Sequence, residues 1–515
     1  MSSNLNRTLQ FRKSSATGRR GVVSAQNQKA ADVGAEVLRQ GGNAIDAAIA
    51  TSFALGVLEP WMSGIGGIGY MQIWDAKAKK AQVIEFSARS AAKLDPADYP
   101  LVGGQDDSMF GWPSVVEDRN IYGYSSMALP GVVDGMRLAH ETFATKSWAD
   151  LLAPAIDLAQ RGMEIDWFLV LQVTNAARAL IKSPAAKAVF LADGLPPAVE
   201  AGGYLKNDAL LATLKRLAKA GGRDYYEGEL AKSIAADLAK GGSKISADDL
   251  RDYKAQMVEP IRYDYHGKTL LLPPYLTAGP SLRDAFEVAG PKLDSKGLSA
   301  QSYIAYIEGL ADAYEKRLAG MGDTDNGKSC TSNFCVVDGD GNMVAVTQTL
   351  LAAFGSCTML PSSGITMNNG IMWFDPTPGR PNSISPNKRP LCNMLPTLVL
   401  DGDKPWFAVG ASGGRRIMPA VMQIISFLAD YGLPLEAAFH QPRIDASIMG
   451  QPWYDPLHEA GVQDAVKARF PGAVPKRRDP LPLNYACPAV AMLNADGSCS
   501  GMTEIAQPWA STSAA

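Results

Sequence analysis

The chain has 515 residues, of which 46% are hydrophobic and 20% charged, and its formal net charge is -3 at pH 7. A chain of this length and composition can bury a large core and is not expected to be disordered. No basic cluster is interleaved with aromatic residues, which argues against nucleic acid as a partner. Neither a signal-peptide apolar region nor an apolar run of 18 residues occurs, so we expect a cytoplasmic protein with no membrane partner.

Apolar periodicity predicts alternating helices and strands with few clean domain boundaries. Residues 28–58 are rich in alanine and are expected to form two helices, because Gly41-Gly42-Asn43 interrupts them and Asn43 can cap a helix that begins near Ala44. The remaining elements are expected in this order: strands at 69–75 and 81–86, helices through 131–240, strands within 258–273, helices at 280–290 and 300–319, strands near 394–400 and 405–409, a helix over 415–430, and a strand near 487–494. Residues 319–329 lack apolar periodicity and are predicted to be a loop.

The segment SCTSNFCVVDGDGNMVAVTQTL predicts a β-hairpin. Its apolar runs, Phe334–Asp338 and Met343–Val346, flank the turn sequence 339–342, where glycine and asparagine readily adopt positive φ. Pairing centred on that turn places Thr331 roughly opposite Thr349. Threonine is common in strands, so the two facing hydroxyls have a purely structural interpretation as well.

The cysteines and two glycine-rich motifs are each tested against the kind of site that their pattern could form. All six cysteines lie at or after Cys330 without CxxC spacing, so neither a disulfide framework nor a zinc site is indicated. GIGGIG at 64–69 follows a helix and enters a strand, the reverse of a dinucleotide site, and is interpreted as a turn that allows close backbone approach. GASGG at 410–414 does lie between a strand and a helix, so Ser412 with Asp445 and His458 is an α/β-hydrolase alternative.

The hairpin offers a third kind of chemistry. A threonine hydroxyl needs a base beside it, and the α-amino group of Thr331 becomes that base if the peptide bond after Cys330 is cut. An α-amine has a reference pKa of about 7.7 to 8.0, which suits general-base work near neutral pH. Thr349 would then orient the nucleophile, and Gly413 with Gly414 at a helix start could present N–H groups to an oxyanion.

Five segments together resemble the γ-glutamyltransferase family of N-terminal-nucleophile hydrolases over nearly the whole chain: GVVSAQNQKAADVGAEVLRQGGNAIDAAIATSFALGVLEPWMSGIGGIGY, ALPGVVDGM, TSNFCVVDGDGNMVAVTQTL, SGITMNNGIMWFDPTPGRPNS and GASGGRRIMPAVMQ. The resemblance implies an α+β fold, a four-layer αββα sandwich, and a proenzyme cut between Cys330 and Thr331. The large subunit, residues 1–330, and the small subunit, residues 331–515, would form one αββα unit, with further dimerisation left open. Thr331 is then the nucleophile of both self-cleavage and catalysis, Thr349 its hydrogen-bonding partner, and Gly413 with Gly414 the oxyanion hole, with no metal or cofactor.

The chain departs from the family pattern at the positions that grip a γ-glutamyl group. An arginine after Phe86 is replaced by Ser87, with Arg89 two residues further on. Six further positions differ from the family pattern. The chain has Asn333 where the family has a histidine, Leu351 where it has an asparagine, and Gly370 where it has a glutamine. It also has Trp373 where the family has an aspartate, and Cys392-Asn393 where the family has two serines. Losing several charge-assisted contacts, each worth roughly 1.5 to 3 kcal/mol, should abolish useful glutathione binding.

The resemblance implies a self-processing amidohydrolase that acts on a small-molecule amide, and the substitutions favour a substrate with a less polar acyl group. Taken singly, Trp373, Cys392 and Leu351 are equally compatible with core packing. A true γ-glutamyltransferase or glutathione hydrolase is the first alternative. The alternatives of another class are the Ser412 hydrolase and a scaffold protein that no longer catalyses.

Overall fold

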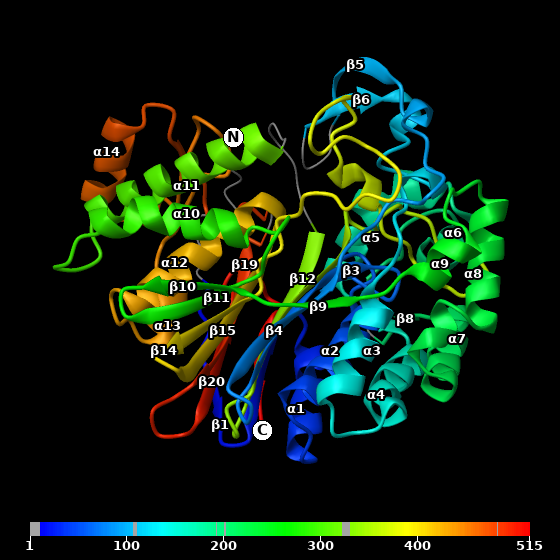
Figure 1. The fold of residues 1–515 in the computed structure, drawn as a ribbon, viewed down its shortest axis with the longest axis horizontal. Helices are drawn as coiled ribbons and strands as arrows, with labels where there is room; N and C mark the ends of the chain where they lie inside the picture. Colours follow the sequence, from blue (N-terminus) through cyan, green and yellow to red (C-terminus); the bar gives the residue numbers. More distant parts are fainter. Residues whose placement is uncertain (1–10, 107–110, 192, 200–201, 322–329, 481–482) are drawn as a thin grey trace.

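The computed structural model describes residues 11–106, 111–191, 193–199, 202–321, 330–480 and 483–515. Two seven-stranded sheets lie face to face between two helical layers, and every strand pair within these two sheets is antiparallel (Figure 1). This is the predicted α+β sandwich. Within the described residues, no helix is both long and apolar enough to cross a membrane.

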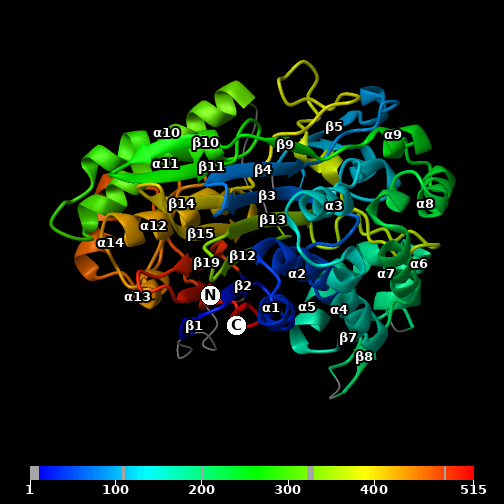
Figure 2. The same cartoon turned by 60° about the horizontal axis from the view of Figure 1, so that its bottom comes forward.

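We call the two sheets the β12 sheet and the β15 sheet after their central strands. The β12 sheet has the order β21 (Ser511–Ala514), β2 (Gly21–Ala25), β12 (Cys330–Asp338), β13 (Met343–Leu351), β3 (Ile68–Asp75), β4 (Lys80–Phe86) and β9 (Gln256–Val258). The β15 sheet has the order β1 (Ala16–Gly18), β20 (Cys499–Thr503), β19 (Cys487–Leu493), β15 (Lys404–Ser412), β14 (Thr397–Asp401), β11 (Lys268–Leu272) and β10 (Ile261–Tyr265). Figure 2 shows β2, β12, β13, β3, β4 and β9 side by side in that order.

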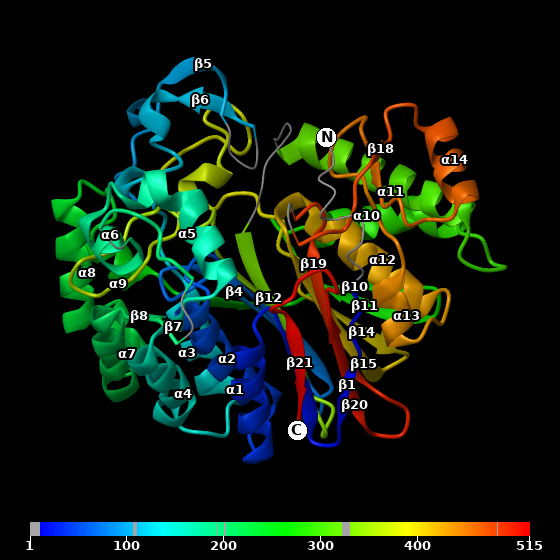
Figure 3. The same ribbon diagram turned by 180° about the vertical axis from the view of Figure 1, so that it is seen from behind.

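The helices divide between the two outer layers (Figure 3). Those on the side of the β12 sheet are α1 (Gln28–Arg39), α2 (Ala44–Leu58), α3 (Val132–Phe143), α4 (Trp148–Arg161), α5 (Trp167–Leu180), α6 (Pro184–Phe190), α7 (Asp208–Ala220), α8 (Glu229–Lys240) and α9 (Ala247–Asp252). Those on the side of the β15 sheet are α10 (Gly279–Ala289), α11 (Ala300–Met321), α12 (Ile417–Ala429), α13 (Leu435–His440) and α14 (Ala460–Arg469). Short strand pairs complete the fold: β5 (Leu101–Gln105) with β6 (Pro113–Val115), β7 (Met163–Glu164) with β8 (Tyr204–Leu205), and β17 (Trp453–Tyr454) with β16 (Ile444–Asp445) and β18 (Val474–Pro475).

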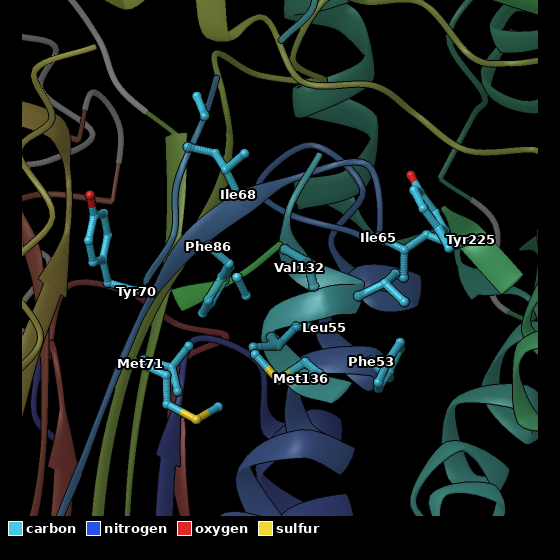
Figure 4. Close-up of a cluster of buried hydrophobic side chains, with 14 of the residues drawn as sticks. Phe53, Leu55, Ile65, Ile68, Tyr70, Met71, Phe86, Val132, Met136 and Tyr225 are labelled. Carbon is cyan, nitrogen blue, oxygen red and sulfur yellow. The ribbon is translucent and has the colours of Figure 1, made fainter. Parts of the chain in front are cut away.

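Both faces of the central strands are buried, which explains their nearly continuous apolar sequence. Along β12, Cys335 and Val337 belong to the core between the two sheets, whereas Phe334 and Val336 belong to the core under the helices. Side chains of a strand alternate between its two faces, so the odd-numbered residues of this part of β12 point toward the β15 sheet and the even-numbered ones toward the helices. Figure 4 shows the same alternation on β3, where Tyr70 points to the opposite side of the strand from Met71.

The predicted second helix begins where expected. Asn43 caps α2, its side chain accepting hydrogen bonds from Ile45 N and Asp46 N, while the Asp46 carboxylate accepts one from Asn43 N. This reciprocal arrangement satisfies N–H groups that the first turn would otherwise leave unpaired. All residues of α2 except Gly56 are buried, which its alanine-rich sequence permits because the helix packs on several sides.

The GIGGIG segment is the predicted close-approach turn. A Cβ at Gly66 would lie 2.3 Å from Thr366 O, one at Gly67 would lie 2.6 Å from Thr349 O, and one at Gly69 would lie 2.4 Å from Thr347 O. No side chain fits at these distances, so glycine lets the backbone lie directly against Thr366 at Gly66 and against β13 at Gly67 and Gly69.

The structure corrects the predicted loop at 319–329 in part. Residues 319–321 continue α11, since alanine and methionine are good helix formers and one glycine is tolerated. Residues 322–329 lie outside the described residues. Each of the two sheets contains strands from before and after residue 330, so these two parts of the chain share both sheets.

Candidate active site

The hairpin of β12 and β13 places four polar side chains on the face that looks toward the β15 sheet. Asn333 pairs with Thr347 in the strand register, and Thr347 Oγ1 donates a hydrogen bond of 3.2 Å to Asn333 Oδ1. Asn333 lies against the β15 sheet, because a Cβ at Gly410 would be 2.2 Å from its Oδ1. Thr331 and Thr349, two residues further along each strand, lie at the end of this inner face.

Thr331 and Thr349 meet there. Thr331 Oγ1 donates a hydrogen bond to Thr349 Oγ1 at 3.4 Å, and Leu351 N donates to the same Thr349 oxygen at 2.8 Å. The register shifts between Cys330 and Ser332, so a bulge surrounds Thr331, and Leu351 opposite adopts a φ of +84°. Bulges commonly re-aim a side chain at the edge of a sheet, and here the bulge lies at the predicted nucleophile.

Gly413 and Gly414 follow β15 at the same end of the sandwich. Their φ angles are +136° and +59°, a region that favours glycine, and a Cβ at Gly413 would lie 2.8 Å from Ala486 Cα. A short 3₁₀ turn, Gly414–Arg416, then leads into α12. Asn333 lies over Gly410, and Asp338 at the other end of β12 accepts a hydrogen bond from Cys499 Sγ, whose strand partner Leu493 lies next to the Met492–Phe407 pair at the start of β15. These two contacts show that Thr331 and Gly413 lie toward the same edge. Backbone N–H groups at such a helix start can hydrogen-bond an anion.

A row of paired residues runs across the inner face of the β12 sheet from Asn333. Thr347 pairs with Tyr70, Tyr70 with Glu85, and Glu85 with Gln256 at the far edge. Directly paired residues share a face, so these side chains form one polar strip across five strands. We call it the polar row.

Glu85 is the hub of the polar row, and sequence reasoning missed it. Its Oε1 accepts hydrogen bonds from Ser87 Oγ at 2.7 Å and Tyr70 OH at 3.2 Å, and Arg389 Nη1 lies 3.1 Å from the same atom. A charged residue within the otherwise apolar end of β4, VIEF, was the available signal. Ser87 therefore contributes a hydroxyl to this network where the family pattern has a cation. Arg89, partly buried, lines a cleft with Arg389.

The other predicted substrate-binding residues are mostly packed into the core. Leu351 is fully buried, and Trp373 belongs to the apolar core under the helices. Cys392 is also buried, which raises its pKa to about 11, while Asn393 next to it is partly buried. A Cβ at Gly370 would lie 2.4 Å from Ala128 Cβ, so the larger residue of the family pattern would not fit here unchanged.

Ser412, Asp445 and His458 do not form the catalytic triad of the α/β-hydrolase alternative. Ser412 ends an antiparallel strand, and its Oγ accepts a hydrogen bond from Gln26 Nε2. Asp445 accepts hydrogen bonds from Ser447 N and Oγ, and the His458 ring packs edge-on against Tyr303. No hydrogen bond joins Ser412, Asp445 and His458 to one another, so the α/β-hydrolase prediction lacks its geometry.

Glu59 is a second acidic residue that sequence reasoning missed. It ends α2 on the helix side of the β12 sheet, where Ser332 Oγ donates to its Oε2 at 3.5 Å. Its Oε1 has no hydrogen-bond partner in the described part of the chain. Burial raises the pKa of this carboxyl to about 8. Ser332, the residue after Thr331, thus contacts a buried carboxyl group that is largely protonated at neutral pH.

Comparisons with known proteins identify the family to which this chain is similar. The family model described as Gamma-glutamyltranspeptidase matches residues 30–330 and 324–479. The chain is 30% identical to "Glutathione hydrolase proenzyme" of Bacillus subtilis, over 88% of this chain and 85% of that protein. It is 31% identical to "Acylase ACY 1 proenzyme" of a Pseudomonas species, over 84% of this chain and 83% of that protein.

A solved structure shows the same fold. The cephalosporin acylase from Bacillus halodurans superposes with a TM-score of 0.86 and covers 100% of this chain and 99% of its own, at 24% identity. Together with the match of the family model over most of the chain, these relatives establish that the chain is an amide-bond hydrolase belonging to the gamma-glutamyltranspeptidase family.

Proposed function

We propose that this protein is a self-processing amidohydrolase that uses Thr331 as its nucleophile and acts on an acyl group other than γ-glutamyl. The observation that carries the proposal is the pairing of Thr331 with Thr349 at one end of the inner face, with Gly413 and Gly414 at the same end. The proenzyme names of two relatives, and the sharing of both sheets between the residues before and after 330, support processing into two interleaved subunits.

Self-cleavage would begin with attack of Thr331 Oγ1 on the carbonyl carbon of Cys330. The peptide C–N bond breaks as the C–O bond forms, which leaves Cys330 as an ester on the hydroxyl and frees the Thr331 amine. Water then hydrolyses that ester and releases the carboxylate of Cys330. The product carries an N-terminal threonine whose own α-amine is the nearest base.

Turnover would use the same atoms. The amine takes the hydroxyl proton as Thr331 Oγ1 attacks the substrate carbonyl, and the N–H groups of Gly413 and Gly414 stabilise the tetrahedral oxyanion. The proton passes to the leaving amine, and an acyl-enzyme ester remains. Water, activated by the α-amine, releases the acid. Thr349, held by Leu351 N, would keep the hydroxyl in position throughout.

The proposed change of substrate rests on the region around Ser87. Ser87 presents a hydroxyl that is hydrogen-bonded to Glu85, and Trp373, at the position of the family aspartate, lies in an apolar core.

A specific observation favours the second candidate, a γ-glutamyl hydrolase. Glu85 and Arg389 supply one acidic and one basic group in the same region, and several relatives are named glutathione hydrolases.

Two anilide substrates separate these candidates. We expect purified wild-type enzyme to hydrolyse a simple alkanoyl p-nitroanilide faster than γ-glutamyl p-nitroanilide, and Thr331→Ala to hydrolyse neither. Ser412→Ala is the matched control and should retain activity. A clear preference for the γ-glutamyl compound would favour the second candidate, and activity in Thr331→Ala would overturn the nucleophile assignment.

A further inference from the structure

The turn that carries Gly413 lies directly against a second strand. Ser412 pairs with Cys487 in the register of β15 and β19, so Gly413 and Ala486 face each other one residue beyond this pair. A Cβ at Gly413 would lie 2.8 Å from Ala486 Cα and 2.9 Å from Ala486 Cβ. No side chain separates the two backbones, and closely packed interiors transmit small displacements. The position of Ala486 therefore determines the position of Gly413.

Arg443, which directly precedes β16, holds Ala486 in place. Its Nη2 donates hydrogen bonds to Ala486 O at 3.1 Å and to Glu504 Oε2. The side chains of Arg443 and Glu504 are only 1% and 2% exposed, so this ion pair is almost completely removed from water. A buried pair of this kind is weak as a source of stability, but removing one partner leaves the other charge uncompensated. One nitrogen thus joins a buried carboxylate to the backbone carbonyl behind Gly413.

Glu504 anchors the same stretch of chain a second time. Burial alone would raise the pKa of this carboxyl, but the charges of Arg443 and Arg478 lower the pKa below its usual value, so Glu504 is ionised. Arg478 Nε lies 3.6 Å from Glu504 Oε1, and Glu504 N donates to Pro488 O at 2.9 Å. The chain at the start of β19 is therefore held at two carbonyl groups, Ala486 O by Arg443 and Pro488 O by Glu504.

The helix that follows the glycine turn is tied to Arg443 as well. Gln423 of α12 makes two hydrogen bonds with the backbone of Ile444, the residue after Arg443: its Oε1 accepts from Ile444 N at 2.9 Å, and its Nε2 donates to Ile444 O at 2.9 Å. Only one short 3₁₀ turn separates Gly413 from α12. The contacts thus form a closed ring that runs from Gly413 through α12, Ile444, Arg443 and Ala486 back to Gly413.

We propose that Arg443 is a positioning residue for amide hydrolysis, which acts through Ala486 to hold the Gly413 N–H in the direction of the tetrahedral oxyanion. This inference rests on the proposed function, because it takes Gly413 as an oxyanion donor. Arg443 lies behind Gly413, so it acts on the reaction only through the backbone. An oxyanion contact is strongest in the transition state, so loss of Arg443 should lower kcat and leave KM nearly unchanged.

Arg443→Met tests this inference, since it keeps an unbranched apolar stem and removes the guanidinium group. The turnover of a p-nitroanilide is measured per mole of chain that carries Thr331 at its N-terminus, so that poor processing is not counted as slow chemistry. We expect kcat to fall at least about tenfold, which is less than the roughly 100- to 1,000-fold cost of removing an oxyanion donor outright. Arg216→Met is the matched control: it removes the partner of the Asp224 carboxylate, which is 8% exposed, in the helical layer of the β12 sheet, and it should lower stability without changing kcat.

Inhibition by butaneboronic acid is a second readout, which a merely structural role would not change. Thr331 Oγ1 adds to the boron atom as its proton passes to the α-amine, and the resulting tetrahedral boronate resembles the oxyanion. The inhibition constant should therefore rise in Arg443→Met by about the same factor as kcat falls, while KM stays within about twofold of wild type. A processed Arg443→Met enzyme with wild-type kcat and a wild-type inhibition constant would overturn the inference.

Arg443→Lys decides the question if Arg443→Met does not fold. It keeps a positive charge opposite Glu504, but its ammonium group ends short of the Nη2 position and should not reach Ala486 O and Glu504 together. We expect the same two changes with a smaller size, and wild-type values in both readouts would overturn the inference. Failure of the proposed function looks different, because activity in Thr331→Ala, or a wild-type chain that is never cut before Thr331, would contradict the nucleophile rather than Arg443.

Discussion

Thr331 Oγ1 and Thr349 Oγ1 lie 3.4 Å apart where β12 and β13 reach the end of the sandwich, and Leu351 N fixes the second hydroxyl at 2.8 Å. The backbone N–H thus holds Thr349 in one orientation, and Thr349 Oγ1 in turn accepts a hydrogen bond from the Thr331 hydroxyl. A hydroxyl held in this way loses little further freedom when it attacks a carbonyl group.

Replacing Thr349 therefore has a definite expected effect. Thr349→Val keeps the shape of the side chain and removes the hydroxyl, so both self-cleavage and anilide turnover should slow by about 10- to 100-fold. Thr349→Ser keeps the hydroxyl and should retain most activity. The appearance of the small fragment on a denaturing gel, followed over time, measures the first rate. Equal rates for Thr349→Val and wild type would show that this hydrogen bond does not orient the nucleophile.

Gly413→Ala should damage both stability and activity. At a φ of +136°, with the new Cβ 2.8 Å from Ala486 Cα, the substitution forces the backbone to move and should cost about 1 to 3 kcal/mol of unfolding free energy. Gly461→Ala in α14 is the control, since nothing lies within 4 Å of its Cβ and alanine favours a helix. Chemical denaturation and turnover on the same samples measure both effects, and a Gly413→Ala enzyme with normal stability and kcat would contradict the expected displacement of the backbone at this turn.

Glu59 should make stability fall as pH rises. Its pKa is raised to about 8 in the folded chain from 4.5, so the folded state binds an extra proton between these values. The stability that this proton contributes is fully present below about pH 4.5 and is lost as pH rises through 8, with a slope of up to about 1.4 kcal/mol per pH unit.

Glu59→Gln removes this titration. The variant should be more stable than wild type at pH 9 and lose that advantage toward pH 5. Glu164→Gln, which removes a surface carboxyl that is 49% exposed, is the matched control. Melting temperatures from pH 5 to 9 measure the difference, and parallel curves for Glu59→Gln and wild type would show that Glu59 titrates normally.

Restoring the family aspartate should not restore γ-glutamyl recognition by itself. Trp373 is only 6% exposed and packs in the core under the helices, so Trp373→Asp would leave a cavity and bury a charge. We expect a loss of about 3 to 5 kcal/mol in unfolding free energy. Trp373→Phe should cost much less. A stable Trp373→Asp enzyme with increased γ-glutamyl p-nitroanilide turnover would contradict this account of the pocket.

Local chemistry and motif order predicted much of this architecture. The cap at Asn43, the turn at 339–342 and the pairing of Thr331 with Thr349 depend on residues close in sequence, so spacing alone predicted them. The layer arrangement was expected from the family resemblance. The register bulge at Thr331 was not predicted, because the turn alone does not fix pairing at the far end of a nine-residue strand.

The chemistry of the pocket was less predictable. Glu85, Tyr70 and Arg389 meet only because β3 pairs with β4 and because a segment some 300 residues later packs on them. No periodicity in the sequence encodes such a contact. Trp373 and Leu351 were considered for the pocket because they replace polar family residues, but a substitution pattern cannot separate a pocket wall from the core behind it.

The measurement that tests the central claim most directly is the intact mass of the purified chain under denaturing conditions, with N-terminal sequencing of any small fragment. The account predicts two species of about 35 and 20 kDa from the 54.8 kDa chain, the smaller beginning Thr331-Ser332-Asn333, and a single uncut chain for Thr331→Ala. One uncut wild-type chain that still hydrolyses an amide, or a fragment that begins elsewhere, would contradict it.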